Sequence, residues 1–263
     1  MRFTKMEGLG NDYIYVDCLE RPLEHPERWA VRLSRRHFGV GADGLICITP
    51  GRGGDFSMEM YNADGSRGAM CGNGIRCVGK YVYDHGLTRK QCLTIDTDAG
   101  PRQLELEVRG STVRRVAVDM GAAALRPSVE ASCGGQTFQV RPVNVGNPHG
   151  VIFCDDPEAI RLEQYGPLLE RHPALPERSN IEFAAGAGED LTVRVWERGS
   201  GITLACGTGA CAAFAAARRL GRCGNHARVR LPGGVLEVEQ RGEHLWMSGP
   251  AVEVFQGVLS EEG

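Results

Sequence analysis

The sequence predicts an α+β protein made of two similar halves, and three observations lead to this prediction. Most of the chain reads as short alternating strands separated by turns rich in glycine, proline and asparagine. Two apolar helices, at 75–85 and 210–220, each follow a glycine-rich loop that opens with a cysteine. Polar residues recur at matching offsets before the two loops. The predicted halves are 1–117, completed by the last strand at 251–263, and 118–250.

The matching offsets indicate an internal duplication. Asn11 lies 60 residues before Cys71, and Asn147 lies 59 residues before Cys206. The polar residue nine positions before each cysteine ends a predicted strand or begins a turn. Such repetition is typical of duplicated units. Two like halves related by a pseudo-two-fold axis would bring both helix N-termini to one cleft, which is a usual place for a ligand.

The individual elements follow from local patterns. Alternation of apolar and polar residues predicts strands, and the spacing of Trp29, Val31 and Leu33 predicts a helix. The first half is expected to contain a strand, turn and strand at 3–18, a helix at 26–36, strands at 45–48 and 55–61, a turn at 62–66, the helix at 75–85 and strands at 93–95, 104–108 and 116–118. The second half is expected to contain strands at 146–153 and 191–196, the helix at 210–220 and strands within 228–258. The second helix is small and apolar on every side, which predicts a buried central rod.

Cys71 and Cys206 are the candidate catalytic residues, because each is predicted to lie at the start of a helix. The first N–H groups of a helix lack intrahelical partners, and the helix dipole is positive at that end. Both effects favour a thiolate and also a carboxylate docked beside it. The hypothesis is therefore a pair of sulfur acid–bases that face one carbon bearing a carboxylate.

Three other interpretations of the glycine-rich segments and their cysteines compete with this hypothesis. Cys71 with Cys77, and Cys206 with Cys211, could be halves of a zinc site, but offsets of six and five residues turn the sulfurs apart by roughly 240° and 140° on a helix. The run 39–44 matches G-x-G-x-x-G, yet a helix precedes it and a strand follows it, which is the reverse of a dinucleotide fingerprint. The two cysteines could also be packing residues beside turns.

Composition favours a globular protein that acts on a small molecule. The chain has 263 residues, a formal net charge of -3 and 42% hydrophobic residues, so it lacks the basic excess of a nucleic-acid-binding protein. No run of eighteen apolar residues predicts a membrane span. The N-terminus leads into a strand, which favours a cytoplasmic protein with reduced thiols. The remaining cysteines outside the loops are expected to be small packing residues, namely Cys18, Cys47, Cys92, Cys133, Cys154 and Cys223.

Eight segments together resemble those of the diaminopimelate epimerase family. Members of this family are cofactor-independent amino-acid epimerases of lysine and peptidoglycan biosynthesis. Two of them are the loops Met70-Cys71-Gly72-Asn73-Gly74 and Ala205-Cys206-Gly207-Thr208-Gly209 with their flanks. The others lie at 8–12, 36–41, 61–66, 146–149, 179–183 and 195–199. The resemblance spans nearly the whole chain.

The resemblance implies two similar α/β halves, each a curled, mainly antiparallel sheet around a central helix. It implies that LL-diaminopimelate is epimerised to meso-diaminopimelate with Cys71 and Cys206 as the two acid–bases, that no cofactor or metal takes part, and that the protein is a homodimer. By the same resemblance, the backbone N–H groups of Gly72, Asn73, Gly207 and Thr208 hold the carboxylate at the reacting carbon. Matching positions for the distal groups of the substrate are Asn11, Asn62, Asn147, Asn180, Glu197 and Arg198, and His149 matches a supporting position.

Physical chemistry agrees with these roles. Proton removal next to a carboxylate concentrates charge there, so two helix ends can stabilise the transition state more than the ground state. A planar guanidinium such as that of Arg198 is the natural partner of a distal carboxylate.

Many family members carry glutamine where this chain has Gly44. A racemase of the histidine or proline type on the same fold, and a zinc-binding interaction protein, are the alternative functions.

Overall fold

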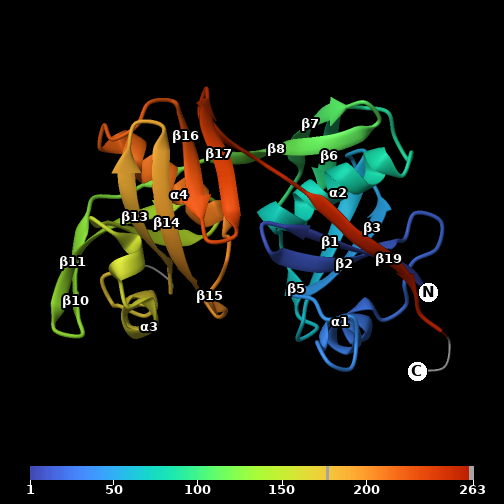
Figure 1. Cartoon of the computed structure of the whole chain (residues 1–263), viewed down its shortest axis with the longest axis horizontal. Coiled ribbons are helices and arrows are strands. Elements are labelled where there is room, and N and C mark those ends of the chain that lie inside the picture. The colour runs from blue at the N-terminus through green and yellow to red at the C-terminus, as the bar shows by residue number, and fades with distance from the viewer. Residues whose placement is uncertain (176–177, 261–263) are drawn as a thin grey trace. The chain divides into compact units, whose positions relative to one another are not determined.

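The computed structural model describes residues 1–175 and 178–260 and divides the chain into two compact units. The first unit is Met1–Val118 together with the C-terminal segment from Gly249 on, and the second is Asp119–Ser248. Each unit combines a sheet with helices, and both are seen in Figure 1. The predicted α+β class is confirmed.

The first unit contains most of the predicted N-terminal elements. Its strands and helices are β1 (Arg2–Gly8), β2 (Asn11–Asp17), α1 (Pro26–Ser34), β3 (Gly44–Pro50), β4 (Phe56–Asn62), β5 (Arg67–Gly68), α2 (Gly72–Asp84), β6 (Cys92–Asp96), β7 (Arg102–Arg109) and β8 (Thr112–Ala122), with β19 (Val252–Val258) from the C-terminal segment. Strand β19 pairs antiparallel with β1. Strand β8 continues into the second unit.

The second unit has the same sequence of elements after two additional strands. It contains β9 (Ala124–Leu125), β10 (Val129–Cys133), β11 (Gln136–Asn144), β12 (Pro148–Phe153), a short 3-10 helix (Pro157–Ala159), α3 (Leu162–Glu170), β13 (Asn180–Ala187), β14 (Asp190–Glu197), β15 (Gly201–Ile202), α4 (Gly207–Arg219), β16 (His226–Leu231), β17 (Gly234–Arg241) and β18 (His244–Gly249).

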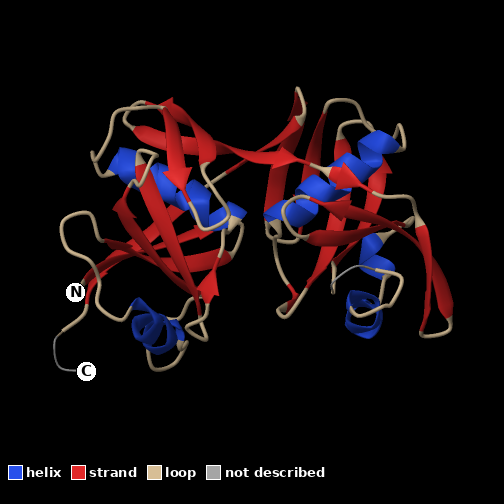
Figure 2. Ribbon diagram, turned by 180° about the vertical axis from the view of Figure 1, so that it is seen from behind, coloured by secondary structure: helices blue, strands red, loops and turns tan. Residues whose placement is uncertain are grey.

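Strand pairing repeats step by step between the units. In the first, β1 and β2 are antiparallel, β2 and β3 parallel, β3 and β4 antiparallel, β4 and β6 parallel, and β6 and β7 antiparallel. In the second, the same order of pairings runs through β11, β12, β13, β14, β16 and β17. Helices occupy corresponding connections in both units, as the view in Figure 2 shows. This agreement supports the duplication inferred from sequence offsets.

Helices α2 and α4 are the buried centres of their units. All residues of α2 except Asp84 are buried, and the alanine-rich α4 packs against β11, β12, β13 and β17. Both helices start earlier than predicted, at Gly72 and Gly207 instead of 75 and 210. The reason is that each cysteine caps its helix, so the glycine-rich residues after it already form the first turn.

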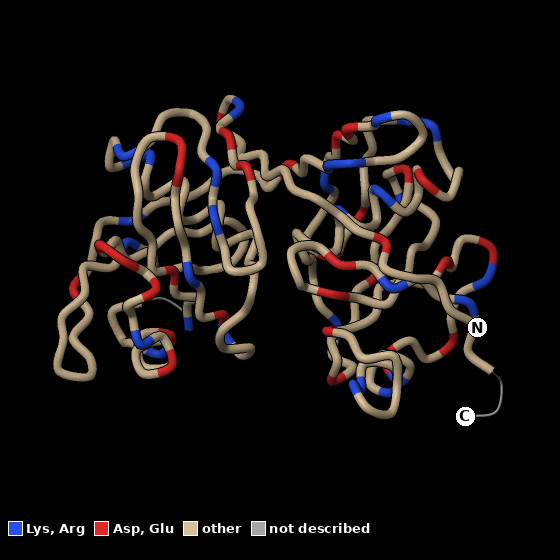
Figure 3. Tube along the Cα trace, viewed as in Figure 1, with Lys and Arg blue, Asp and Glu red and all other residues tan. Residues whose placement is uncertain are grey.

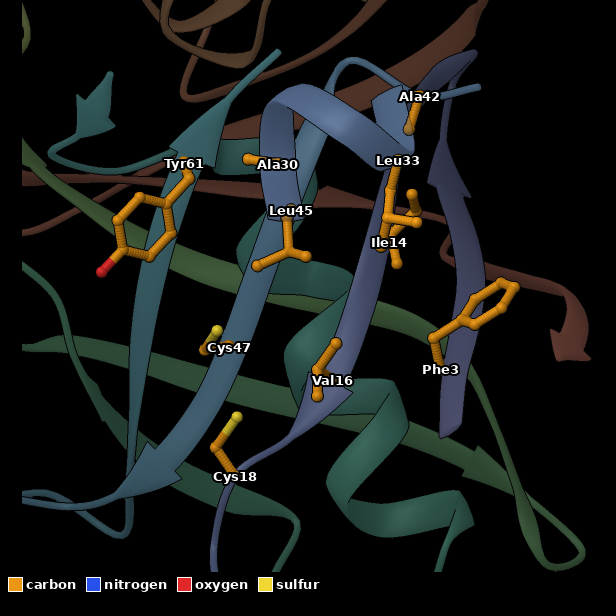
Figure 4. Packing of buried hydrophobic residues seen from close by; sticks show 10 residues of the cluster. All are labelled: Phe3, Ile14, Val16, Cys18, Ala30, Leu33, Ala42, Leu45, Cys47 and Tyr61. Carbon is orange, nitrogen blue, oxygen red and sulfur yellow. The ribbon is translucent and has the colours of Figure 1, made fainter. Parts of the chain in front are cut away.

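Helices α1 and α3 cover the opposite side of strands that face the central helices. In the first unit, Ile14 and Val16 of β2 pack with Leu33 of α1 and Leu45 of β3 (Figure 4). In the second, Phe183 of β13 belongs to the corresponding core beside α3. Because side chains alternate along a strand, the residues between these core positions point toward α2 or α4. Asn11 on β2 and Asn180 on β13 lie on such alternate positions.

One of the ten cysteines is exposed at the surface. All ten cysteines are free thiols, but Cys92 is exposed, so its prediction as a packing residue was wrong, because β6 begins at its surface end there. Acidic and basic residues are interspersed along the trace of each unit (Figure 3). Among the described residues, no helix has the length and apolar character needed to span a membrane.

Candidate functional site

Cys71 and Cys206 are the N-cap residues of α2 and α4. The Sγ atom of Cys71 accepts a hydrogen bond from the Gly74 N–H at 3.3 Å, and the Sγ of Cys206 accepts one from the Gly209 N–H at 3.3 Å. Both residues have extended backbones, with φ of -127° and -119°. Cys71 is partly exposed, whereas Cys206 is buried. The two predicted loops therefore have the same geometry.

The residues that follow each cysteine form the first turn of its helix. Gly72 and Asn73 begin α2, and Gly207 and Thr208 begin α4. The first N–H groups of an α-helix point outward along its axis, away from the following turns. They are therefore suited to bind an anionic group close to the cysteine sulfur.

Strand β2 places three polar side chains on the face toward α2. The Cys71 thiol donates to Asn11 Oδ1 at 3.2 Å, and the Tyr15 hydroxyl donates to the Gly74 carbonyl at 3.1 Å. Between them, the Tyr13 hydroxyl also hydrogen-bonds with Cys71, and burial raises the pKa of Tyr13. Sequence analysis named Asn11 but missed Tyr13, although its alternation with Asn11 along the strand was visible.

Asn11 is itself held by a carboxylate. Its Nδ2 donates to Asp43 Oδ2 at 2.8 Å, and the Asp12 N–H donates to the same oxygen at 3.2 Å. Burial, followed by the charge of Asp12, raises the pKa of Asp43. This anchor fixes the amide so that its oxygen faces Cys71.

Asn62 lies at the end of β4, opposite Gly44 in the antiparallel register. Its Nδ2 donates to Ser66 Oγ at 2.9 Å, which fixes it in the turn before the first cysteine loop. A β-carbon at Gly44 would lie 2.2 Å from the Tyr61 carbonyl oxygen and 2.8 Å from the Tyr13 ring. Glycine is thus the residue that this backbone spacing accommodates. Helix α1 precedes 39–44 and β3 follows, so the order of elements that excludes a dinucleotide fingerprint is confirmed.

A chain of hydrogen bonds leads from Cys206 into the second unit. Cys206 Sγ lies 3.4 Å from Thr208 Oγ1, and Asn147 Nδ2 donates to that hydroxyl at 3.4 Å. Asn147 Oδ1 lies 3.0 Å from His149 Nε2, and His149 Nδ1 lies 2.7 Å from Glu182 Oε1. His149 and Glu182 are fully buried. Glu182 was not predicted, although a charged residue between Ile and Phe in an apolar strand was a signal for it.

Glu197 is the second carboxylate near Cys206. It accepts a hydrogen bond from Thr203 at 2.5 Å and interacts with the Cys206 side chain. Burial raises the pKa of Glu197, with the charge of Glu182 adding to the effect. Burial also raises the pKa of Cys206 well above its usual value, and the charges of Glu197 and Glu182 reinforce the shift. Burial and these two charges therefore favour the thiol form of Cys206.

Asn180 and Arg198 meet at the ends of adjacent strands. The buried Asn180 side chain accepts a hydrogen bond from the Arg198 N–H at 2.8 Å and donates to the Pro148 carbonyl at 3.2 Å. Asn180 is also the β13 partner of His149 on β12. Asn180 thus fixes the backbone at which Arg198 leaves β14, and the Arg198 side chain is exposed.

The second cysteine of each pair lies away from the loops. Cys77 is fully buried in α2 beside Tyr15, and burial raises its pKa to about 12. Cys211 is fully buried in α4. Within residues 1–175 and 178–260, no group of three or more His, Cys, Asp or Glu side chains is arranged to hold a metal ion.

Comparisons with known proteins find a family match over most of the chain. The family model described as diaminopimelate epimerase matches residues 3–126 and 142–254. A diaminopimelate epimerase from Bacteroides thetaiotaomicron is 49% identical and one from Acetivibrio thermocellus is 46% identical, each over 98% of both chains. The crystal structure of a probable proline racemase from Agrobacterium radiobacter superposes with a TM-score of 0.77 at 15% identity, covering 99% of this chain and 93% of that one. That last likeness concerns the fold alone.

Proposed function

The chain belongs to the diaminopimelate epimerase family, and from this premise we propose that it converts LL-diaminopimelate to meso-diaminopimelate by a two-cysteine acid–base mechanism without a cofactor. The protein is an isomerase of the epimerase type. The observation that carries the mechanism is the matched pair of cysteine N-caps, Cys71 on α2 and Cys206 on α4.

The reaction inverts one carbon, so a proton must leave one face and another must arrive at the opposite face. One sulfur removes the α-proton as a thiolate, and the other donates a proton as a thiol. The amides of Gly72, Asn73, Gly207 and Thr208 hold the adjacent carboxylate, on which negative charge builds up. Stabilisation of this charge by helix N-termini replaces the electron sink that a cofactor would supply.

The environments of the two sulfurs support a division of roles. Burial and the carboxylates Glu197 and Glu182 raise the pKa of Cys206, which suits a proton donor. Cys71 is more exposed and accepts the Gly74 N–H, which suits a base at a helix N-terminus. In the conversion of LL-diaminopimelate, Cys71 takes the proton and Cys206 supplies one from behind. His149, held by Glu182 and Asn147, supports the Cys206 side.

Arg198 is assigned to the distal carboxylate of the substrate, and Asn11, Asn62, Asn147, Asn180 and Glu197 to positioning its polar groups. The exposed side chain of Arg198 extends from a backbone position that Asn180 fixes through a hydrogen bond to the Arg198 N–H. A guanidinium there can bind a carboxylate through two parallel hydrogen bonds. Histidine or proline lacks a distal carboxylate to pair with it. We therefore expect LL-diaminopimelate to be preferred over both.

Incubation of the reduced protein with single amino acids in heavy water tests this function. Proton NMR follows loss of each α-proton, and chiral chromatography follows inversion. Rapid exchange and inversion of LL-diaminopimelate, with at least about a hundredfold lower kcat/KM for histidine and proline, would support the assignment. Equal or faster turnover of histidine would assign the chain to the alternative racemase activity.

The proposal includes a homodimer in the cytoplasm, serving lysine and peptidoglycan precursor synthesis. Strand β19 carries exposed apolar side chains at Val252, Val254, Phe255 and Val258, which a second copy could cover. A thiol mechanism also suits a reducing compartment. Light scattering of the purified protein should give twice the mass of the 28.5 kDa chain, and Val254→Lys should reduce it to that of a monomer. A monomer in the unsubstituted protein would contradict the dimer.

A further inference from the structure

Tyr13 is a buried residue of β2, and its equivalent in the second unit is His149 of β12. Asn11 and Asn147 are matching positions of the duplication, and Tyr13 and His149 each follow two residues later. His149 lies 3.0 Å from the Asn147 side chain through its Nε2 atom. Tyr13 thus lies in the first unit at the position that this supporting imidazole holds in the second.

Glycine at position 44 leaves space for the Tyr13 ring. Tyr13 lies opposite Gly44 in the parallel register of β2 and β3. In the equivalent register of β12 and β13, His149 lies opposite Asn180. A β-carbon at Gly44 would lie 2.8 Å from Cε1 of Tyr13, whereas packed carbon atoms are about 3.5–4.0 Å apart. The ring of Tyr13 therefore takes space that a side chain uses at the equivalent position of the second unit.

The Cys71 sulfur is contacted by a backbone amide, an asparagine and a tyrosine. The Gly74 N–H donates to Sγ at 3.3 Å, and the thiol donates to Asn11 Oδ1 at 3.2 Å. The Tyr13 hydroxyl hydrogen-bonds with the side chains of both Cys71 and Asn11. Because a carboxylate only accepts, Asp43 holds the Asn11 Nδ2 and leaves the amide oxygen facing the thiol. Tyr13 therefore adds a hydroxyl to the partners of a thiol whose proton is directed at Asn11.

Ionisation of Cys71 changes which of these contacts stabilise the sulfur. Cys71 is partly exposed, so its proton can pass to solvent. The Asn11 oxygen, an acceptor, then has no thiol proton to bind, while the Gly74 N–H and the Tyr13 hydroxyl remain as donors. Burial raises the pKa of Tyr13, so its hydroxyl keeps its proton beside the thiolate. Because a hydrogen bond to a charged acceptor is stronger than one to a neutral acceptor, this hydroxyl stabilises the thiolate more than the thiol.

We propose that Tyr13 is a positioning residue whose hydroxyl donates to the Cys71 sulfur and stabilises its thiolate form. The inference rests on the proposed function, in which Cys71 is the base. It adds to the site a residue that the family resemblance does not imply. The two units then differ in chemistry, with a phenol beside Cys71 and an imidazole held by Glu182 in the unit that carries Cys206.

Tyr13→Phe tests the hydroxyl, because phenylalanine keeps the ring beside Gly44. Reduced full-length protein is alkylated with iodoacetamide across a pH series, and peptide mass spectrometry follows Cys71 and Cys206 separately. The midpoint for Cys71 should rise by about one pH unit, while that for Cys206 should not change. At neutral pH this rise lowers the thiolate fraction about tenfold, so kcat should fall about tenfold with a smaller change in KM. The other titratable groups around Tyr13 and Cys71 stay in place, namely Glu7 on β1, Tyr15 on β2, Asp43 before β3, and Arg76 and Cys77 on α2.

Tyr81→Phe is the matched control, because it removes the hydroxyl of another buried tyrosine in the same unit. Tyr81 lies near the C-terminal end of α2, and its ring stacks on that of His85 with 4.0 Å between centroids. This variant should leave both cysteine midpoints and kcat unchanged. Thermal unfolding reports whether each variant is folded.

A measurement on the unsubstituted protein needs no variant to fold. The chain has six tyrosines, which ¹³C NMR follows in protein labelled at the tyrosine Cζ atoms. One signal should shift through the same midpoint as Cys71 alkylation, because a hydroxyl that donates to the sulfur responds to the charge on it. That shift should be absent from Tyr13→Phe.

Three results would overturn the inference. One is that no tyrosine signal follows the Cys71 midpoint in the unsubstituted protein. Another is an unchanged or lower Cys71 midpoint in folded Tyr13→Phe. The third is an equal rise of the midpoint in Tyr81→Phe, which would indicate a general loss of packing. A Cys71 midpoint that depends on Tyr13, in a protein that does not epimerise diaminopimelate, would refute the proposed function and leave this inference intact.

Discussion

The Nδ1 atom of His149 lies 2.7 Å from the Oε1 atom of Glu182, and neither side chain is exposed to solvent. The other ring nitrogen of His149, Nε2, faces Asn147, so the imidazole is fixed from both sides. A β-carbon at Gly209 would lie 2.9 Å from Glu182 Oε1, which places the carboxylate directly under the first turn of α4. Glu182 therefore connects the orientation of His149 to the loop that carries Cys206.

Replacing Glu182 with glutamine should weaken catalysis more than substrate binding. An amide can keep one hydrogen bond to His149 but loses the charge, and a charged buried hydrogen bond contributes about 1.5–3 kcal/mol. We expect kcat to fall by about 10- to 100-fold with little change in KM. Steady-state kinetics on LL-diaminopimelate measures this, and Glu189→Gln at a surface turn provides the control. A Glu182→Gln enzyme with normal kcat would show that the pair has no catalytic consequence.

Replacing Glu197 with glutamine should make Cys206 easier to ionise. Burial raises the pKa of Cys206, and the carboxylate charge of Glu197 adds to that rise because it disfavours a thiolate beside it. Without the charge, the pKa of Cys206 falls and its thiolate fraction at a given pH increases. A fall of one unit in the pKa of Cys206 corresponds to about tenfold faster alkylation of this residue at pH values below the pKa. Site-resolved alkylation at fixed pH checks the direction, and slower alkylation of Cys206 would contradict it.

Replacing Arg198 with alanine should impair recognition of the distal carboxylate. Loss of a charge-assisted bidentate contact leaves that carboxylate without its partner, so kcat/KM for LL-diaminopimelate should fall by about 100-fold. Arg198→Lys should recover part of the loss, since it keeps the charge but not the planar fork. Arg219→Ala, at an exposed position at the end of α4, is the matched control. If Arg198→Ala retains normal efficiency, the assignment of this residue is incorrect.

The cysteine loops and the helices that follow them could be predicted because their signals are local. Cys71 and Cys206 precede glycine-rich residues and apolar helical runs, and the positive φ of 76° at Gly86 and 68° at Gly221 ends each helix as expected. The helix starts were missed by three residues. The low helix propensity of glycine led to a loop being predicted after each cysteine. In the structure, the cysteine side chain caps the helix, so the glycine-rich residues that follow already form its first turn.

The residues that support the cysteines could not be predicted in the same way. Tyr13 and Glu182 reach the cysteine loops because β2 and β13 pass alongside α2 and α4, a relationship set by tertiary packing. For Glu182, the signal in the sequence was a charged residue between apolar neighbours, and for Tyr13 it was the alternation with Asn11 along the strand.

The most direct measurement of the two-base mechanism is the isotope content of the earliest product formed in heavy water. If Cys71 removes the α-proton and Cys206 donates from its own exchanged S–D group, the first meso-diaminopimelate should be almost wholly deuterated at the inverted carbon while unreacted LL-diaminopimelate retains protium. Cys71→Ala and Cys206→Ala should each lower epimerisation by a factor on the order of 100 or more. Substantial protium in early product, or a single-cysteine variant with near-normal rate, would contradict two opposed sulfur bases.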